Sequence, residues 1–485
     1  MTRHSERASG ADARKLPLAL LAAILAAALG ACGRSAPDGA AGTAPAPRAN
    51  LVLFSIDTLR AGQLGCYGYG RETSPAIDAL AAEGIVFDTV HSQSPKTGPS
   101  HMTMMTGLYP STHGVLNWSN EGTFALSEAI PTLAEILREN GYATFASTGG
   151  GNVRSQLGFD RGFSEYRMNA GSAALNVSVG EGQLARHIAS GDARPFFLFL
   201  HTYQTHDPYF PPQGYLERIA PRSAYAGKIF SSAQELVKIA GPGWQEQHDL
   251  YWSRVDRGDP ADRQRLVDLY DACVRSADDA FASLVAMLRE RGLLEKTVIV
   301  VTADHGEEFL EHGQFMHDQI YREIAQVPLV IRLPEKALAG RRVDGIARLV
   351  DVTPTLLDVL GVKTRAVFQG ESLWSAGAGP AAGPRTAFTE WTKRAPGKPD
   401  MFAARTVDWS LVRVGEAPPE LFAASDREEK ANVASAHPDV VRQLEAFIGG
   451  KRSECAQLAR LRPPGSSVEL TPEIRQQLEQ LGYLK

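Results

Sequence analysis

The sequence predicts an α/β protein with a doubly wound, mostly parallel sheet and a smaller C-terminal α+β subdomain. Short apolar runs bounded by polar residues recur along the chain, and such runs are typical of buried parallel strands. Segments with apolar residues at helical spacing separate these runs. Strands that alternate with helices indicate crossover connections, with helices on both faces of one sheet.

The first buried strand is expected at residues 50–57, NLVLFSID. A helix is expected at 74–84, where Ser74 suits the N-cap, Pro75 the first turn and Gly84 the end. The following elements are expected in this order: helix and strand over 130–148, strand 195–202, helix 262–292, strands 297–304 and 327–334, and helix 349–361. Residues 214–262 are polar and irregular, so we expect an insertion near the functional site.

The chain is expected to divide into four parts. A signal peptide at 1–32 precedes a tether at 33–49, which is rich in Pro, Gly and Ala and therefore flexible. A catalytic domain is expected at 50–375, and a Gly/Ala/Pro stretch then leads into the C-terminal subdomain at 385–485. The subdomain is expected to hold a strand at 406–414 and helices at 437–448 and 471–482.

The N-terminus predicts export and anchoring. The uncharged run at 16–30 would form a helix of about 22 Å, which is short for a bilayer core of about 30 Å and suits a signal peptide. Cys32 follows small residues as in a bacterial lipobox, and an ordinary secretion signal with an incidental cysteine is the alternative. We expect a lipid-anchored protein of the bacterial cell envelope, periplasmic or surface-exposed, held on the membrane by its N-terminal lipid.

Composition excludes some classes of function. Lys and Arg total 50 and Asp and Glu total 55, so no basic surplus points to nucleic acid as a partner. The remaining cysteines, Cys66, Cys273 and Cys455, are far apart and odd in number. We therefore expect free thiols and no disulfide framework.

Two acidic residues fall at the carboxyl ends of predicted strands, where ligands bind in open α/β sheets. Asp57 ends the first strand, and Asp304 ends a later one with His305 next to it. Oxygen and nitrogen donors together suit Zn, Mn or Mg, and Ca less well because of the imidazole. We expect one divalent metal ion, Mn, Zn or Ca, and a second ion stays open. The alternative is that each acid only caps a helix.

Thr97 lies in the loop KTGPSH, ahead of a predicted helix. Gly98 allows close backbone approach, and Ser100 is a plausible N-cap for that helix. Threonine becomes a competent nucleophile when a metal lowers the pKa of its hydroxyl, so Thr97 is expected to lie on the ion. The commoner role of such a threonine is helix capping.

Three histidines lie near these positions. His206 follows a predicted strand, His317 follows the Asp-His pair, and His101 follows the threonine loop. Imidazoles can hold an oxyanion or protonate a leaving group, although a lone histidine is more often structural. The acidic segment GEEFLEHG at 306–313 is expected to be a solvated loop.

Together the motifs NLVLFSIDTLRAGQLGCYGY, PSHMTMMTGLYPSTHGV, IPTLAEILRENGYATF and TVIVVTADHGEEFLEHG resemble the sulfatase-like hydrolases of the alkaline phosphatase superfamily. The resemblance covers nearly the whole chain after the tether. It implies metal ligands at Asp57, Asp304 and His305, the nucleophile at Thr97, and contacts with the transferred group at His206 and His317.

The departures from the family pattern bear on the reaction. Sulfatases carry a Cys or Ser that is oxidised to formylglycine, and here the pentad is TGPSH. Threonine is a secondary alcohol, so that oxidation cannot give an aldehyde. Imidazoles also replace family residues: His101 replaces an arginine, His317 a lysine and His305 an asparagine. In addition, Thr58 replaces an aspartate of the family's first metal motif.

The sequence therefore predicts a metal-dependent hydrolase or transferase of anionic esters that works through a covalent Thr97 intermediate. A phosphate ester, above all a phosphodiester, is favoured over a sulfate ester, because a singly charged diester needs fewer fixed cations. The substrate can be a glycan, a lipid or a small molecule. The alternatives are a sulfatase without formylglycine, and a non-catalytic, lipid-anchored protein that binds an anion or glycan.

Overall fold

The computed structural model of the chain describes residues 48–116, 123–169, 171–221, 225–241, 243–375, 379–392, 397–469 and 471. Within them, nine strands form one central sheet. Eight strands follow one another across it in the order β10 (Gln326–Val327), β2 (Ile85–His91), β11 (Leu329–Arg332), β7 (Thr297–Thr302), β1 (Asn50–Ile56), β6 (Phe196–Thr202), β4 (Ala143–Thr148) and β5 (Glu165–Met168), and β12 (Arg341–Arg348) pairs with β2.

The middle of this sheet is parallel. Strand β1 runs parallel to β7 on one side and to β6 on the other, and β4 continues the parallel half beside β6. Strands β10 and β11 run antiparallel to their neighbours. Ser55 of β1 pairs with Thr302 of β7 and His201 of β6, so the residues after all three strands emerge at one edge.

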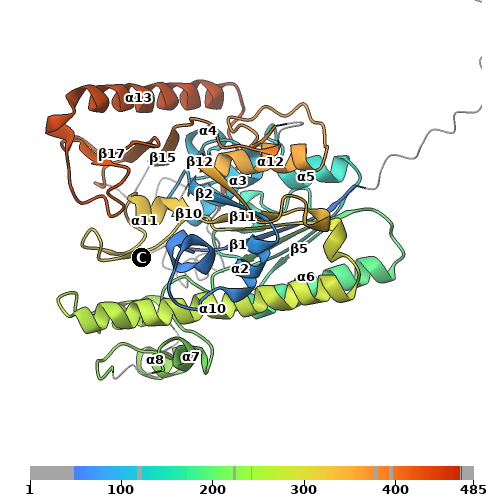
Figure 1. The fold of residues 1–485 in the computed structure, drawn as a ribbon, viewed down its shortest axis with the longest axis horizontal. Helices are drawn as coiled ribbons and strands as arrows, with labels where there is room; N and C mark the ends of the chain where they lie inside the picture. The colour runs from blue at the N-terminus through green and yellow to red at the C-terminus, as the bar shows by residue number, and fades with distance from the viewer. Residues whose placement is uncertain are drawn as a thin grey trace, which may run out of the picture. The chain divides into compact units, whose positions relative to one another are not determined.

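Helices cover both faces of the sheet, as Figure 1 shows. One face carries α2 (Pro75–Ala82), α6 (Ala173–Ala189) and α10 (Pro260–Glu290), and the other carries α3 (Thr97–Thr106), α5 (Leu133–Glu139) and α12 (Val352–Val359). Phe54 of β1 stacks on Phe281 of α10 with ring centroids 5.7 Å apart, which fixes that helix on the sheet. The predicted doubly wound, mostly parallel α/β fold is confirmed.

A second, smaller sheet follows near the C-terminus. Its antiparallel strands are β15 (Ala387–Trp391), β16 (Met401–Arg405), β17 (Trp409–Val414) and β18 (Glu420–Ala423). Helix α13 (Pro438–Arg460) covers it, and Leu444 and Ile448 of the helix share a core with Phe388, Leu411 and Leu421 of the sheet. The predicted α+β subdomain is confirmed, and residues 472–485, which include most of the predicted last helix, lie outside the described residues.

One local prediction was wrong, and a second, the N-cap at Ser74, is confirmed in position only. The segment 214–262 is helical over much of its length, with α7 (Tyr215–Ile219), α8 (Ala233–Ala240) and α9 (Trp244–Ser253). Ser74 occupies the N-cap position of α2 without a capping hydrogen bond, because its hydroxyl contacts Asp78 instead.

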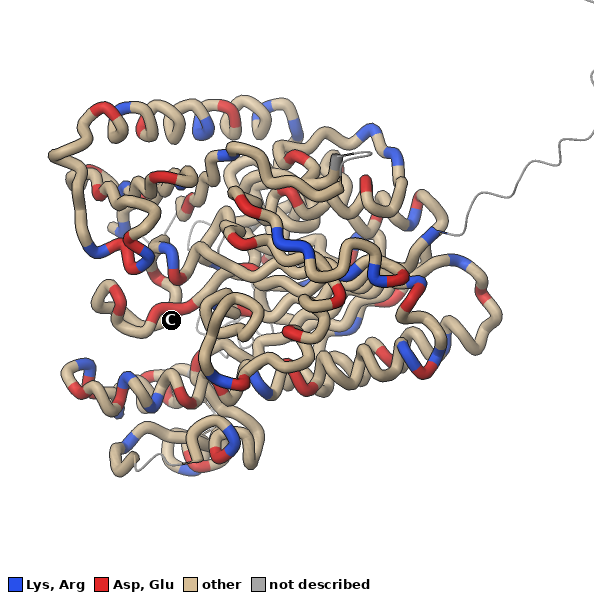
Figure 2. Tube along the Cα trace, in the orientation of Figure 1, with Lys and Arg blue, Asp and Glu red and all other residues tan. Residues whose placement is uncertain are grey.

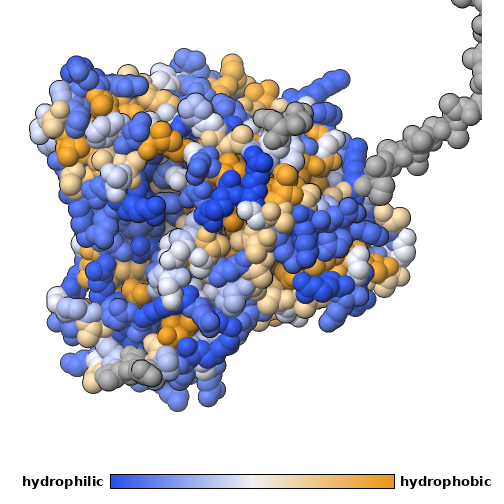
Figure 3. All heavy atoms as spheres, in the orientation of Figure 1, coloured by the Kyte–Doolittle hydropathy of each residue, from blue (hydrophilic) through white to orange (hydrophobic). Residues whose placement is uncertain are grey.

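The remaining elements are short. They are α4 (Pro110–His113), α11 (Arg322–Ala325), β3 (Thr123–Phe124), β8 (Glu308–Phe309), β9 (Phe315–Met316), β13 (Trp374–Ser375), β14 (Gly379–Pro380) and β19 (Ser467–Val468). Basic and acidic residues are interspersed along the trace in Figure 2, and hydrophobic residues are scattered among hydrophilic ones on the face in Figure 3. Among the described residues, no helix has the length and apolar character that crossing a membrane requires. Cys66, Cys273 and Cys455 are free thiols, as expected.

Candidate active site

Asp57, Asp304 and His305 lie together at one edge of the central sheet. Asp57 directly follows β1, and Asp304 and His305 follow the neighbouring strand β7. All three side chains are fully buried, and one donor atom from each lies within 4.8 Å of the others. The backbone N–H of Thr58 donates to Asp304 Oδ1 at 3.2 Å, which ties the two strand ends together. The predicted convergence of these residues is present.

Each of these side chains turns an unpartnered polar atom inward. Asp57 Oδ1, Asp304 Oδ2 and His305 Nε2 are buried without a hydrogen-bond partner. His305 Nδ1 donates to the carbonyl of Gly306 at 2.9 Å, so its Nε2 carries the lone pair. Buried polar atoms are seldom left unpaired, and a histidine that binds metal usually donates its other nitrogen to an acceptor. The donor set therefore fits a divalent cation.

The electrostatics of the two carboxyl groups point the same way. Burial raises the pKa of Asp57 to about 6, and contacts with Asp304 and Thr97 oppose the rise. Burial, together with the negative charge of Asp57, raises the pKa of Asp304 well above its usual range. Two buried carboxylates repel each other, so without a cation they do not both ionise readily. A bound cation offsets both the cost of burying the two negative charges and the repulsion between them.

Thr97 is the first residue of α3 and is fully buried. Its side chain hydrogen-bonds the Asp57 carboxylate, which places the hydroxyl at the cation cluster. Gly98 leaves little room for a side chain beside it, since an added Cβ would lie 3.3 Å from the carbonyl oxygen of Asn152. The N-cap expectation for Ser100 was wrong: α3 begins three residues earlier, and the Ser100 hydroxyl donates to the Asp304 carbonyl at 2.7 Å.

His101 lies beneath the cluster and uses both ring nitrogens there. Its Nδ1 lies 2.9 Å from the Thr97 carbonyl oxygen, and its Nε2 lies 2.9 Å from Ser55 Oγ. Burial lowers the pKa of His101 to about 4, so the ring is neutral near pH 7. Through these contacts His101 holds the first turn of α3, and its part in proton transfer stays a prediction. His201, which the sequence analysis did not single out, supports Asp57 from the other side, with Nε2 3.4 Å from Asp57 Oδ2.

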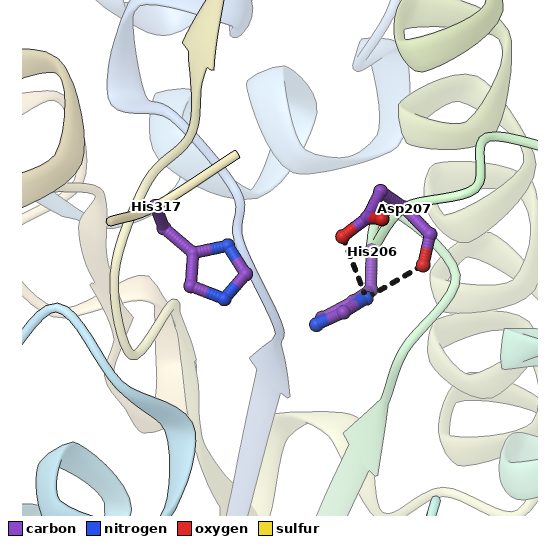
Figure 4. Close-up of side chains that lie close together, drawn as sticks. All are labelled: His206, Asp207 and His317. Atoms are coloured by element: carbon purple, nitrogen blue, oxygen red, sulfur yellow. Dashed lines mark hydrogen bonds and ion pairs between the residues drawn. The ribbon is translucent and has the colours of Figure 1, made fainter. Parts of the chain in front are cut away.

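His206 and His317 face each other, as the close-up in Figure 4 shows. Their ring centroids lie 5.2 Å apart, and the ring of His317 lies 4.5 Å from that of His305. The structure thus brings the predicted residues Thr97, His206 and His317 to the same site as the cation cluster.

Two acidic residues of this site were missed by the sequence analysis. Asp207 follows His206 and is buried, and its Oδ2 accepts hydrogen bonds from His248 Nε2 and Trp252 Nε1, both at 3.1 Å. Glu307 is fully buried and accepts from Tyr209 at 3.0 Å. The expectation of a solvated GEEFLEHG loop was therefore wrong at Glu307. The glutamates that follow the Asp304-His305 pair in the sequence were the signal that could have identified Glu307.

A cavity of about 660 Å³ opens beside His206. Its wall combines Tyr203 and Gln204 after β6 with Leu216, Ser232 and Gln234 of the helical insertion. The insertion therefore borders the site, as predicted, and contributes to the shape that a substrate meets.

Comparison with known families identifies the fold and the class of chemistry. The sequence profile of the family described as Sulfatase matches residues 49–362, which contain every residue of the site. The chain belongs to the sulfatase family. A second profile, N-sulphoglucosamine sulphohydrolase, C-terminal, matches residues 310–437. The chain is a sulfatase-family hydrolase, a class that acts on sulfate esters.

The curated relatives have low sequence identity to this chain and align with most of its length. Arylsulfatase K of Xenopus laevis is 24% identical over 443 residues, spanning 82% of this chain and 81% of its own length. N-acetylglucosamine-6-O-sulfatase of Bacteroides thetaiotaomicron is 24% identical over 430 residues, spanning 74% of this chain and 75% of its own length.

Solved structures share the fold at low identity. A chain in complex with its substrate D-glucosamine-2-N,6-O-disulfate aligns with a TM-score of 0.70 at 20% identity, covering 84% of this chain and 98% of its own. A phosphonate monoester hydrolase from Silicibacter pomeroyi aligns with a TM-score of 0.67 at 21% identity, covering 84% of this chain and 96% of its own.

Proposed function

We propose that the chain is a metal-dependent hydrolase or transferase that cleaves an anionic phosphate ester, favouring diesters, through a covalent intermediate on Thr97. One observation carries this proposal. The Thr97 side chain, buried at the first turn of α3, hydrogen-bonds the carboxylate of Asp57, whose inward oxygen belongs to a cation-binding cluster.

Asp57, Asp304 and His305 would hold the cation, with the Thr97 hydroxyl beside it. A bound divalent cation lowers the pKa of a hydroxyl and neutralises charge on the transferred group. Asp57 orients the Thr97 oxygen for in-line attack on phosphorus. Thr97 gives up its hydroxyl proton to solvent as the bond from its Oγ1 to phosphorus forms, and the leaving oxygen takes up a proton as its bond to phosphorus breaks.

The other residues support this step. Thr97 is the first residue of α3, and the positive end of the helix dipole favours negative charge on a group transferred there. His101 holds the Thr97 carbonyl and fixes the first turn of the helix. His206 and His317 face the site, so either can contact the leaving oxygen or steady it. Attack by water, or by an acceptor alcohol, then releases Thr97.

The choice of phosphate over sulfate rests on the nucleophile. Threonine cannot yield the formylglycine aldehyde, whereas its hydroxyl can attack phosphorus directly. Phosphonate monoester hydrolases share this fold, so it accommodates attack on phosphorus as well as sulfur. The second candidate is a sulfate-ester hydrolase, which the sulfatase names of the curated relatives favour, with a sulfated glycan as substrate.

A substrate panel tests the proposal. The chain without residues 1–32 is purified, loaded with Mn, Zn or Ca, and offered chromogenic phosphodiester, phosphomonoester and sulfate esters. The proposal expects diester turnover that disappears in Thr97→Ala. Dominant sulfate release would favour the second candidate, and no turnover with any metal would favour a binding protein.

We also propose that Cys32 carries the lipid that anchors the enzyme to the bacterial envelope, with residues 33–49 as a tether to the catalytic domain. Residues 1–47 lie outside the described residues, so the sequence alone supports this proposal. Metabolic labelling with a radioactive fatty acid tests it: label is expected in the full chain and absent from Cys32→Ala. A labelled Cys32→Ala protein would contradict it.

A further inference from the structure

A second cavity, of about 630 Å³, lies where the edge of the central sheet meets the C-terminal subdomain. Its wall includes residues of β2 and β12 from the central sheet, residues of α11, and the residues at the ends of β16 and β18. Helix α11 lies next to the C-terminal sheet, where the rings of Tyr321 and Phe422 have centroids 6.3 Å apart (Figure 1). Among the described residues, this wall includes neither Thr97 nor any member of its cation cluster.

The wall of this cavity is rich in charge. Six arginines line it, Arg60, Arg263, Arg322, Arg342, Arg405 and Arg427, together with five acids, Asp88, Glu311, Glu323, Asp344 and Glu428. Some of these charges pair across the wall: Arg60 Nη1 lies 2.8 Å from Glu311. Arg342 pairs with Asp88 in the same way. The remaining arginines on the side of the C-terminal subdomain are arranged differently.

Arg322 and Arg405 share the single carboxylate of Glu429. Arg405 Nε and Nη2 each lie 3.3 Å from this carboxylate, and Nη2 also donates to the Ile320 carbonyl at 2.6 Å. The backbone N–H of Arg322 donates to the same carboxylate at 2.8 Å, and its Nη1 donates to the Ala424 carbonyl at 2.9 Å. Both guanidinium groups are therefore held in place, while Glu429 balances only one of their two charges.

Three nitrogen atoms of this group are buried without a hydrogen-bond partner: Arg405 Nη1, Arg322 Nε and His91 Nδ1. All three residues line the cavity, and Arg405 and His91 are only 1% and 2% exposed. Burial lowers the pKa of His91 well below its usual range, so the ring is neutral near pH 7 and can donate one hydrogen bond. Buried polar groups seldom stay unpaired, so this end of the cavity offers donors to a ligand.

The charges at this end favour an anion over water. Burial lowers the pKa of Arg322, and Glu429 opposes this fall. The positive charges of Arg405 and Arg427 add to it, and Asp426 opposes it. Three guanidinium groups thus face two carboxylates, which leaves one positive charge in excess. A bound anion relieves the repulsion among the arginines, whereas an uncharged water molecule does not.

We propose that this cavity binds a phosphate or sulfate group at Arg322, Arg405 and His91. A guanidinium group presents its N–H donors in a planar fork that matches the oxygens of such a group. The cavity also has the size of small-molecule sites, which are about 300–1,000 Å³. The same chemistry has two sources, the free inorganic ion and the same group carried by a larger molecule. The inference does not depend on the reaction at Thr97, because it concerns a different set of residues.

Crystals of the metal-loaded protein soaked in tungstate test the position of the site. Tungstate has the shape and charge of sulfate, and tungsten scatters X-rays anomalously, so each bound ion is located directly. We expect an anomalous peak beside Arg322, Arg405 and His91. Peaks at the cation cluster alone, or no peak at all, overturn the inference.

Titration calorimetry with inorganic phosphate and sulfate measures the same binding in solution. The titration uses protein stripped of metal with a chelator, so that the catalytic cation does not draw the anion. Arg322→Gln should weaken binding at least ~10-fold, because hydrogen bonds to charged groups are the strong ones. Arg413→Gln is the matched control and should bind as the wild type does. Arg413 is also a partly buried arginine that donates to a carbonyl, that of Ala417 at 2.8 Å, and it pairs with Glu445.

Arg427→Gln gives a second variant that the fold tolerates, since Arg427 is exposed. It should weaken binding by about 2- to 5-fold, as expected for an exposed charge. Wild-type affinity in both Arg427→Gln and folded Arg322→Gln overturns the inference.

Glucose 6-phosphate and glucose 6-sulfate, with glucose as the uncharged control, distinguish the two sources of the anion. Binding at least about tenfold tighter than that of the inorganic ions assigns the site to a group carried by a larger molecule. Equal affinity assigns it to the free ion. Failure of both the ions and the esters to bind overturns the inference.

Discussion

Replacing Asp57 with asparagine should stabilise the metal-free protein and abolish its activity. Burial raises the pKa of Asp57 from 3.8 to about 6. A folded-state pKa above the unfolded one means that stability falls as pH rises from about 4 to about 6. The shift of about two units corresponds to a cost of ~3 kcal/mol at pH 8, since one unit is ~1.4 kcal/mol. Asparagine removes this charge and keeps an oxygen that can accept from Thr97.

The metal-loaded protein should show the opposite change. An ion present at a hundred times its dissociation constant stabilises the folded state by ~2.7 kcal/mol. Asp57→Asn removes a charged ligand and should lose most of that gain. We therefore expect the variant to be ~1–3 kcal/mol more stable than the wild type in chelator, and less stable in saturating metal.

The assay is urea unfolding at pH 8, in chelator and in saturating metal, followed by circular dichroism. Asp271→Asn is the matched control, because burial raises its pKa to about 6 as well, while its partners are Tyr69 and Arg71. Its stability change should be the same with and without metal. The reasoning is refuted if Asp57→Asn destabilises the metal-free protein, or gains as much from metal as the wild type does.

Two further predictions concern the support of the site. Gly306→Ala should lower the free energy of unfolding by at least ~2 kcal/mol and weaken metal binding, because the new Cβ would lie 2.1 Å from the backbone oxygen of Glu323. The control is Gly62→Ala, whose Cβ would have nothing within 4 Å and should change neither quantity. Equal melting temperatures of Gly306→Ala and the wild type would contradict this. His312 lies 2.7 Å from the Glu323 carboxylate and 3.1 Å from the Glu429 carbonyl, and hydrogen bonds to Glu323 raise its pKa to about 9 despite burial. Since that pKa is raised, the stabilisation by the charged ring is complete below pH 6.5 and disappears as pH passes 9. The free energy of unfolding of His312→Gln should therefore lie ~2 kcal/mol below that of the wild type at pH 6 and match it above pH 10. The same difference at every pH would argue against a charged ring.

The ends of the buried strands were the most predictable part of the site. Asp57 and Asp304 each follow an apolar run, and parallel strands bring their carboxyl ends to one edge. Thr97 was singled out because its loop resembles the family's nucleophile loop, and its role as nucleophile stays a prediction. These features depend on local sequence and on a regular sheet, so the sequence carries them.

Asp207 and Glu307 could not be found in the same way. Each lies in an irregular segment, and whether its side chain turns inward depends on distant partners such as Trp252 and Tyr209. The acidic run around Glu307 has the composition of a solvated loop. Its burial comes from tertiary packing that composition does not reveal. The helices of the insertion were missed because few of their side chains are buried, although Leu236 and Tyr251 join the main core.

The most direct test of the covalent mechanism is a search for phosphate on Thr97. Metal-loaded enzyme is mixed with a phosphodiester, quenched in acid within milliseconds, digested and analysed by mass spectrometry. The account predicts a transient substrate-derived phosphoryl group on the peptide that contains Thr97, and none on the Thr97→Ala protein. Rapid turnover with an unmodified Thr97, or the phosphoryl group on another residue, would contradict it.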